Sequence, residues 1–240
     1  MKITGLTRIR NEQAIITDTL DHMSTFCDDI FVYDDASNDD TLKICMQHYA
    51  VSGIIQNSVW ESDRAAAETT SRWQLLKFAQ KNSPDTDWFV YMDADERIEF
   101  DFKKLNYWPE WINGIRMKLF DYYITAEDVN EHYTRRRYIG PEYRNILMVF
   151  RNIKGLKYEK PDQRSPIVPG QIIVDGYVKH YGKAVSVEQW EETCNYYASH
   201  FPKYAEKWEA RKGKAVHSLS DFGRPLITWE KKEQKGIKLY

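Results

Sequence analysis

The sequence lacks the features of several common protein classes. It has no run of the roughly 18 apolar residues that a membrane-spanning helix needs, and its amino-terminal MKITGLTRIRNE is charged within ten residues. The three cysteines, Cys27, Cys45 and Cys194, show no CxxC spacing, which argues against zinc and redox motifs. A net charge of -2 gives no general attraction to nucleic acid. We therefore expect a soluble, cytoplasmic protein without a transmembrane segment or a nucleic-acid partner, with peripheral membrane association left open.

Three nucleotide-binding signatures are also missing. No GxxxxGK[ST] phosphate loop occurs, and the RIRNE segment lacks the glycines of a dinucleotide-binding fingerprint. The DFG at 221–223 is not accompanied by the glycine-rich loop, strand lysine or HRD segment of a kinase. These absences argue against a P-loop enzyme, a dehydrogenase and a kinase.

Strand-like and helix-like patterns alternate through the first hundred residues. The 240 residues, 42% of them hydrophobic, are enough for one sizeable core, so we expect a single domain over 1–240. The pattern predicts an α/β fold whose mixed central sheet is flanked by helices and followed by a carboxyl-terminal helical segment. The predicted strands are 2–7, 30–35, 53–57, 88–93, 114–123, 143–151 and 171–181. The first predicted helix has Asn11 as its N-cap, and the second follows Ser37 and carries Leu42, Cys45, Met46 and Tyr49 on one face. Two more helices are predicted over 64–81 and 186–211.

Acidic residues end two of these strands. Asp34 and Asp35 close the second strand, and Asp93 and Asp95 close the fourth. Ligands of parallel sheets bind beyond the carboxyl ends of the strands, so we expect these four side chains on one rim. In an extended segment Asp93 and Asp95 would point to the same side, where their oxygens suit Mg²⁺ or Mn²⁺. The alternative for a bare DxD is a solvated turn.

Several segments in order resemble the family 2 glycosyltransferases, which have the GT-A fold. TRIRNE (7–12) resembles the end of that family's first strand, and YDDASNDDT (33–41) resembles its Asp-Asp-Gly-Ser segment, with Ala36 in place of the usual glycine. Arg72 stands where the family often has Ala-Arg-Asn, with Trp73 replacing the asparagine, and MDADE (92–96) matches the DxD segment. The resemblance covers roughly the first hundred residues.

The resemblance implies roles for individual residues. Asp95 would ligate a Mn²⁺ or Mg²⁺ ion that bridges the donor phosphates, with Glu96 as a neighbour. His180, in VKHYG, would complete the metal's coordination, although a lone histidine is as often structural. Arg8 and Arg72 could instead be surface cations, and Asp34 a helix cap. The implied nucleotide-sugar-binding residues are Thr7, Arg8, Asp34, Asp35, Arg72, Asp93 and Ala94.

The second half leaves the catalytic base open. Inverting members of the family use a carboxylate to deprotonate the acceptor hydroxyl, often from a His-Glu or Glu-Asp pair. The corresponding segment, 151–166, has no such pair, and Asp162, ahead of Glu159, is the nearest candidate. The stereochemical outcome therefore also stays open, with inversion expected.

The sequence thus predicts a metal-dependent glycosyltransferase. Its donor would be a nucleotide-diphosphate sugar bound by 1–100, and its acceptor a hydroxyl of a glycan or glycoconjugate bound by 101–185, with 186–240 as the helical segment. The first rival is a nucleotidyltransferase, which usually has a glycine-rich loop after its first strand. The second is a catalytically inactive sugar-binding scaffold of the same fold. A metal nuclease ranks last, because the lack of a basic surface disfavours it.

Overall fold

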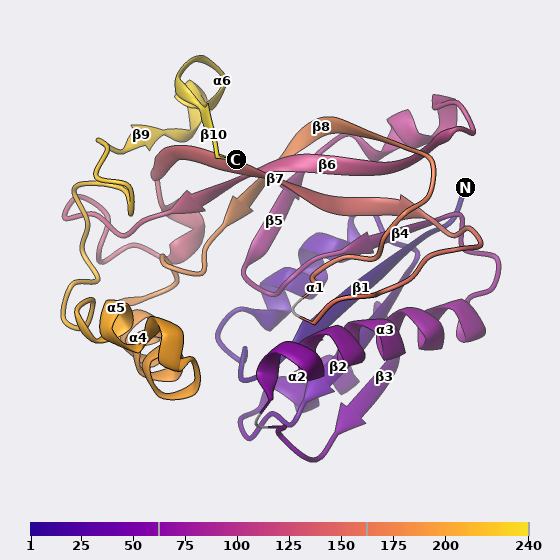
Figure 1. The fold of residues 1–240 in the computed structure, drawn as a ribbon, viewed down its shortest axis with the longest axis horizontal. Helices are drawn as coiled ribbons and strands as arrows, with labels where there is room; N and C mark the ends of the chain where they lie inside the picture. Colours follow the sequence, from indigo (N-terminus) through magenta and orange to yellow (C-terminus); the bar gives the residue numbers. More distant parts are fainter. Residues whose placement is uncertain (62, 162, 240) are drawn as a thin grey trace. The chain divides into compact units, whose positions relative to one another are not determined.

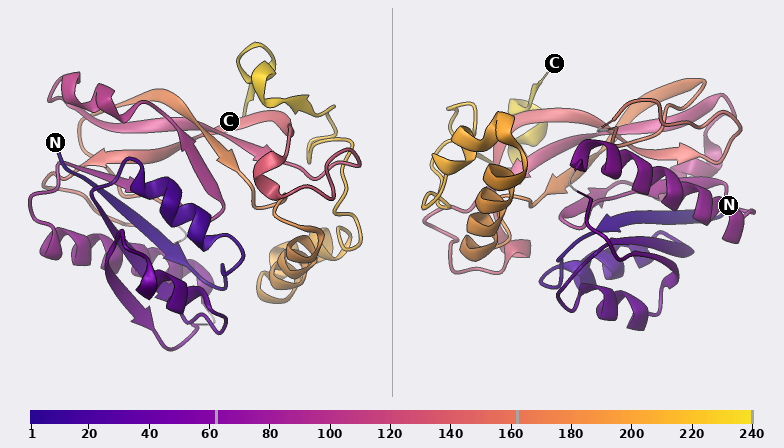
Figure 2. Two further views of the ribbon diagram at one scale, coloured as in Figure 1. Left: turned by 180° about the vertical axis from the view of Figure 1, so that it is seen from behind. Right: turned by 60° about the horizontal axis from the view of Figure 1, so that its bottom comes forward.

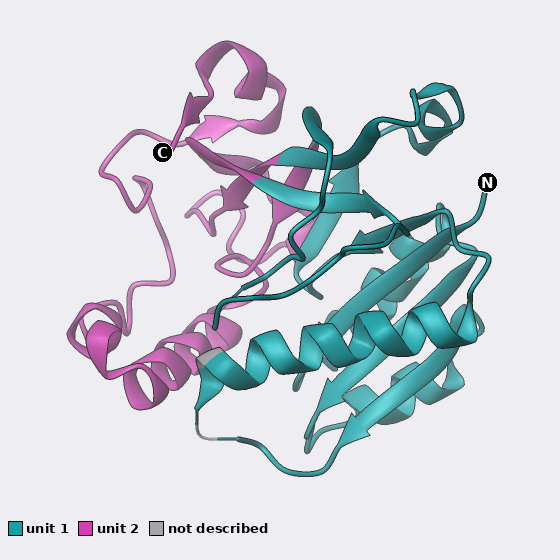
Figure 3. Ribbon diagram, turned by 45° about the vertical axis from the view of Figure 1, so that its right-hand side comes forward, with its two compact units in different colours: residues 1–117, 146–176 teal, residues 118–145, 177–240 magenta. Residues whose placement is uncertain are grey.

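The computed structural model describes residues 1–61, 63–161 and 163–239 (Figure 1). The chain divides into two compact units: Met1–Met117 with Ile146–Gly176, and Lys118–Asn145 with Tyr177–Tyr240 (Figure 3). None of the helices within the described residues is long and apolar enough to cross a bilayer.

The first unit begins with the alternating strands and helices that the sequence predicts. Strands β1, β2, β3 and β4 are parallel and stand in the order β3-β2-β1-β4. Helices α1 and α2 cover one face and α3 the other, because right-handed crossovers in opposite directions place their helices on opposite faces (Figure 2). The elements are β1 Ile3–Ile9, α1 Ile16–Ser24, β2 Asp29–Asp35, α2 Thr41–Gln47, β3 Val51–Asn57, α3 Arg64–Asn82, β4 Trp88–Tyr91 and β5 Glu96–Glu99.

Three longer strands complete the sheet and contribute residues to both units. Strand β7 runs antiparallel to β4, which makes the sheet mixed. The observed architecture, a mixed sheet flanked by helices with a carboxyl-terminal helical segment, confirms the predicted fold class. The remaining elements are β6 Ile112–Tyr122, β7 Tyr138–Arg151, β8 Gln171–His180, α4 Val187–His200, α5 Ala205–Glu209, β9 Ile227–Thr228, α6 Lys232–Lys235 and β10 Ile237–Lys238.

Buried apolar side chains explain why the first unit folds this way. Helix α1 carries Ile16, Leu20 and Met23 at helical spacing, and all three side chains are fully buried. On the opposite face of the sheet, Leu75 and Leu76 of α3 pack into a core cluster with the aromatic rings of β2, β4 and β7. Each such side chain contributes roughly 1.5–3 kcal/mol when fully buried.

Two local predictions about the helices are wrong. Asn11 does not cap α1, which begins at Ile16; its backbone is left-handed, with φ 53°, and its side-chain carbonyl accepts from the backbone N–H of Asn38. On α2, Cys45 is buried as expected, but Met46 is 62% exposed and Tyr49 81% exposed. Tyr49 lies beyond the end of α2, so helical spacing no longer applies to it.

The backbone conformation of Ala36 shows why glycine is usual at this position of the motif that the segment resembles. Its backbone is left-handed, with φ 58°, a conformation that costs a residue with a Cβ about 1–2 kcal/mol and glycine almost nothing. We expect Ala36→Gly to raise the free energy of unfolding by about 0.5–1 kcal/mol, since glycine's greater freedom in the unfolded chain offsets part of the gain. Urea unfolding measures it.

The matched control is Ala67→Gly, within helix α3, where glycine should lower stability by about 1 kcal/mol. A destabilised Ala36→Gly variant would contradict this account of the turn.

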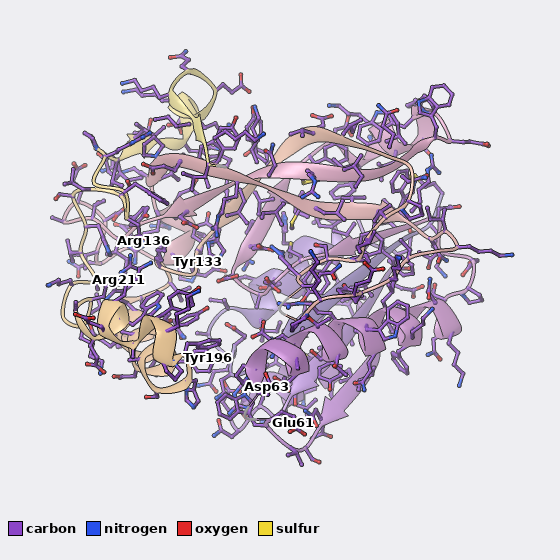
Figure 4. The ribbon with its side chains drawn as sticks, viewed as in Figure 1. Glu61, Asp63, Tyr133, Arg136, Tyr196 and Arg211 are labelled. Atoms are coloured by element: carbon purple, nitrogen blue, oxygen red, sulfur yellow. The ribbon has the colours of Figure 1, made fainter. Side chains whose placement is uncertain are left out.

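The second unit has its own small core. Trp190 and Cys194 of α4 pack with Ala215, and the guanidinium of Arg211, labelled in Figure 4, lies 4.8 Å from the centre of the Trp208 ring. The predicted helix over 186–211 is confirmed in part: Ser186 caps α4, which ends at His200, two residues before Pro202.

Candidate functional site

The parallel strands of the first unit bring the predicted donor-binding residues to one rim. Strand β1 lies between β2 and β4, with Ile9 opposite Asp34 and Leu6 opposite Tyr91. The carboxyl ends of all three strands therefore meet at the same edge of the sheet. The topology confirms the prediction that the acids at the end of β2 and just after β4 lie at this rim.

Asp35 is the centre of an ion-pair network on this rim. Its Oδ2 lies 2.5 Å from Nη2 of both Arg8 and Arg64, and its Oδ1 accepts from the Asn57 amide at 3.0 Å. Burial alone would raise the pKa of Asp35, but the two guanidinium groups outweigh it and hold the pKa below its ordinary value. Asp35 thus orients two cations at the rim, and Arg8 is not an ordinary surface cation.

Arg64 was not predicted from the sequence. It is the first residue of α3 and only 3% exposed. Its guanidinium and that of Arg10 lie 4.8 and 4.5 Å from the centre of the Trp60 ring. The signal was present, because a helix that follows a parallel strand begins at the same rim.

Three buried polar atoms at the rim have no hydrogen-bond partner among the described residues: Thr7 Oγ1, Asp34 Oδ1 and Arg8 Nε. Thr7 and Asp34 are 0% exposed. Burial raises the pKa of Asp34, whose other oxygen accepts weakly from the Ser37 backbone N–H at 3.3 Å. Helix α2 begins at Thr41, so Asp34 is not its cap. Unpaired buried polar atoms are costly, which points to a ligand that pairs them.

The DxD segment forms a turn, not the extended strand end that was predicted. Strand β4 ends at Tyr91, and residues 92–95 connect it to β5. The Glu96 backbone N–H donates to the Asp93 carbonyl at 3.1 Å, and the Glu96 carboxylate accepts from the Asp93 backbone N–H at 2.9 Å. The argument that strand geometry aligns Asp93 with Asp95 is therefore wrong; the turn places them instead.

The carbonyl of Ala94 anchors this turn. It accepts from the Thr19 hydroxyl at 2.6 Å and from the Arg97 guanidinium at 2.8 Å, while its side chain is buried. Ala94 was predicted to bind the donor, and the structure shows it tied to the protein through its backbone oxygen.

Two further arginines lie near the acidic turn. Arg164 donates two bonds to the buried Glu96 carboxylate, at 2.9 and 2.6 Å, and its Nη2 lies 3.5 Å from Asp93 Oδ2. Arg72 is 7% exposed and donates from Nε to the Tyr91 hydroxyl at 2.9 Å. Arg72 is thus no surface cation, and Glu96 is a neighbour of the turn, as predicted. Arg164 was missed because only the fold brings it to β5.

The carboxyl groups near the turn favour a cation. Burial raises the pKa of Glu12 well above its ordinary value, and the carboxylates of Asp95 and Asp93 raise it further. Such hard oxygen ligands fit Mg²⁺ or Mn²⁺. Among the described residues no three His, Cys, Asp or Glu side chains are already arranged as a metal cage, so a bound ion would also need ligands from the donor or from water.

The other predicted residues lie elsewhere. His180, in the second unit, has its Nδ1 2.6 Å from Asp121 Oδ1, the kind of carboxylate contact that orients ligating histidines. Glu159 is about half exposed and pairs with Lys157, and Asp162 lies outside the described residues. The metal role of His180 and the base role of either carboxylate stay predictions.

Comparison with known proteins gives partial similarities. No protein-family model matches the chain. Uncharacterized proteins of Mycobacterium bovis and Mycobacterium tuberculosis are each 33% identical over 103 residues, which cover 42% of this chain and 25% of the relative. The chain therefore matches about a quarter of the length of these curated relatives.

Two solved structures are also similar. Glucosyl-3-phosphoglycerate synthase from Mycobacterium tuberculosis, in complex with Mn²⁺ and uridine-diphosphate-glucose, is 19% identical, with a TM-score of 0.33 over 49% of this chain and 43% of that one. HddC from Yersinia pseudotuberculosis is 10% identical, with a TM-score of 0.43 over 82% of this chain and 100% of that one. Because both TM-scores lie below 0.5, the function proposed below rests on the geometry of the site itself.

Proposed function

We propose that this chain is a metal-dependent glycosyltransferase that moves a sugar from a nucleotide-diphosphate donor to a hydroxyl acceptor. The observation that carries the proposal is a group of buried polar atoms at the carboxyl rim, beside the Asp93–Asp95 turn. These atoms, on Thr7, Arg8 and Asp34, have no hydrogen-bond partner in the described part of the chain. A nucleoside offers both donors and acceptors to such atoms. The acidic turn beside them suits a cation that the donor's diphosphate would share.

The residues divide between binding and chemistry. Thr7 and Asp34 would pair with the nucleoside, and the Arg8 and Arg64 guanidiniums, fixed by Asp35, would lie toward the phosphates. A divalent ion held by Asp95 would offset charge on the leaving nucleoside diphosphate. A carboxylate of the 159–162 segment would take the proton of the acceptor hydroxyl.

Donor hydrolysis separates this proposal from its rivals. The chain is incubated with nucleotide-diphosphate sugars, with and without Mn²⁺, and release of nucleoside diphosphate is measured. Metal-dependent release supports the proposal and excludes an inactive scaffold. A nucleotidyltransferase would instead consume nucleoside triphosphate with a sugar phosphate and release pyrophosphate, and that result would overturn the proposal.

Thr7→Val should raise the free energy of unfolding and weaken donor binding. Valine keeps the shape but removes a buried hydroxyl that has no partner among the described residues, so stability should rise by about 1 kcal/mol. The same hydroxyl is proposed to bind the nucleoside, so donor affinity should fall by about 1 kcal/mol, roughly fivefold. Thermal unfolding and calorimetry measure the two effects.

Thr4→Val is the matched control on the same strand. The Thr4 hydroxyl is equally buried but lies 2.6 Å from the Thr86 hydroxyl, so its loss should cost about 1 kcal/mol of stability and leave donor affinity unchanged. If both variants lose stability and neither affects the donor, Thr7 does not bind the nucleoside.

A further inference from the structure

A cavity of about 380 Å³ lies in the first unit, next to the acidic turn. Its size is that of a small-molecule site. It is bounded by strands β6, β7 and β8 and by the segment 163–168. Its lining residues are Arg116, Ile146, Leu147, Gln163, Arg164, Ser165, Pro166, Ile167, Val168 and Ile172.

Most of the polar side chains in this lining are bonded to the protein itself. The Gln163 carbonyl accepts from the backbone N–H groups of residues 159 and 160, and its amide donates to the Ser165 carbonyl at 2.7 Å. The Ser165 hydroxyl donates to the Leu147 carbonyl at 2.9 Å, and Arg164 bonds Glu96. The cavity therefore offers a ligand mainly aliphatic surface.

The composition of the lining argues against a sugar in this cavity. Six of its residues are aliphatic or proline, and among the described residues that line it there is no aromatic ring. A sugar ring placed there would leave its hydroxyls largely unpaired, which is costly, whereas a hydrocarbon chain would be transferred favourably from water.

Arg164 connects the cavity to the proposed reaction centre. It lines the cavity, and its Nη2 lies 3.5 Å from Asp93 Oδ2. A molecule with an aliphatic part in the cavity would thus hold its polar end beside the Asp93–Asp95 turn.

We propose that this cavity binds the aliphatic part of an amphipathic acceptor, whose hydroxyl-bearing end lies at the acidic turn. The inference rests on the proposed function and narrows it, because it names the class of acceptor as a hydroxyl compound that carries a hydrocarbon chain.

Methyl NMR with alkyl glucosides tests the inference. Protein labelled at isoleucine methyl groups is titrated with methyl, butyl, hexyl and octyl β-glucoside, each below its micelle concentration. The signals of Ile146, Ile167 and Ile172 should move with the longer chains, with affinity rising by up to about fourfold for each added methylene. Equal affinity for methyl and octyl glucoside, or no movement of these signals, would overturn the inference.

Variants on strand β8 sharpen the test. Ile172→Gln, in the cavity lining, should weaken octyl glucoside binding about tenfold. Val174→Gln, on the same strand but 48% exposed and outside the lining, should leave it unchanged. Should Ile172→Gln not fold, Ile167→Gln, at a position 38% exposed, replaces it. Unchanged affinity in a folded lining variant would contradict the inference.

The titration contains neither donor nor metal. The titration can therefore fail while metal-dependent donor hydrolysis succeeds. That result would contradict the proposed aliphatic acceptor and leave the proposed glycosyltransferase activity supported. Hydrocarbon binding without any donor hydrolysis would contradict the proposed glycosyltransferase activity and show only that the cavity binds lipid chains.

Discussion

Asp95→Ala is expected to lower the rate of donor hydrolysis by about a thousandfold while the chain stays folded. Metal stabilisation of a leaving diphosphate contributes several kcal/mol, and about 4 kcal/mol corresponds to that factor. Asp95 lies in the turn between β4 and β5, and its charge raises the pKa of Glu12, so its removal should relieve repulsion and leave the fold intact. Hydrolysis in Mn²⁺ and circular dichroism measure the two parts.

The control for loss of one negative charge is Asp40→Ala, at a side chain that is 69% exposed before helix α2. This variant should hydrolyse donor at the rate of the unaltered chain. A folded Asp95→Ala protein with full activity would show that Asp95 does not hold the metal.

Arg164→Ala should destabilise the protein by about 3–5 kcal/mol. Glu96 is 1% exposed, and Arg164 donates two bonds to it. Without the arginine, the Glu96 carboxylate would lose both of these charge-assisted bonds while staying buried, and breaking a buried ion pair is among the largest penalties for a single substitution. The free energy of unfolding in urea measures the effect.

The double variant Arg164→Met with Glu96→Gln separates this cause from lost packing. It removes both charges and keeps similar volumes, so most of the stability should return. If the double variant is as unstable as Arg164→Ala, the ion pair is not what stabilises the β4–β5 turn.

Local sequence patterns predicted the framework of the first unit well. The strands over 30–35 and 53–57 and the helix over 64–81 are confirmed, because apolar periodicity depends on neighbours in sequence. The common position of the acidic residues could be predicted from these strands, because parallel strands place their carboxyl ends at the same edge of the sheet. What the patterns could not give is backbone geometry: the left-handed conformations of Asn11 and Ala36 leave little trace in hydrophobic spacing.

Long-range pairing accounts for the residues that were missed. Arg164 reaches Glu96 across 68 positions of the chain, and no local pattern records such a contact. The pairing of Arg64 with Asp35 depends in the same way on how helix α3 meets strand β2. The catalytic base also remained open, because the 151–166 segment lacks the paired acids of the resembling family.

The central claim is that the rim binds a nucleotide-diphosphate sugar together with a metal, and calorimetry tests it most directly. The chain is titrated with UDP-, GDP- and dTDP-linked sugars, each with and without Mn²⁺. We expect one donor to bind, in the presence of Mn²⁺ only, and Thr7→Val to weaken that binding where Thr4→Val does not. Absence of binding for every donor in the presence of Mn²⁺ would contradict the claim.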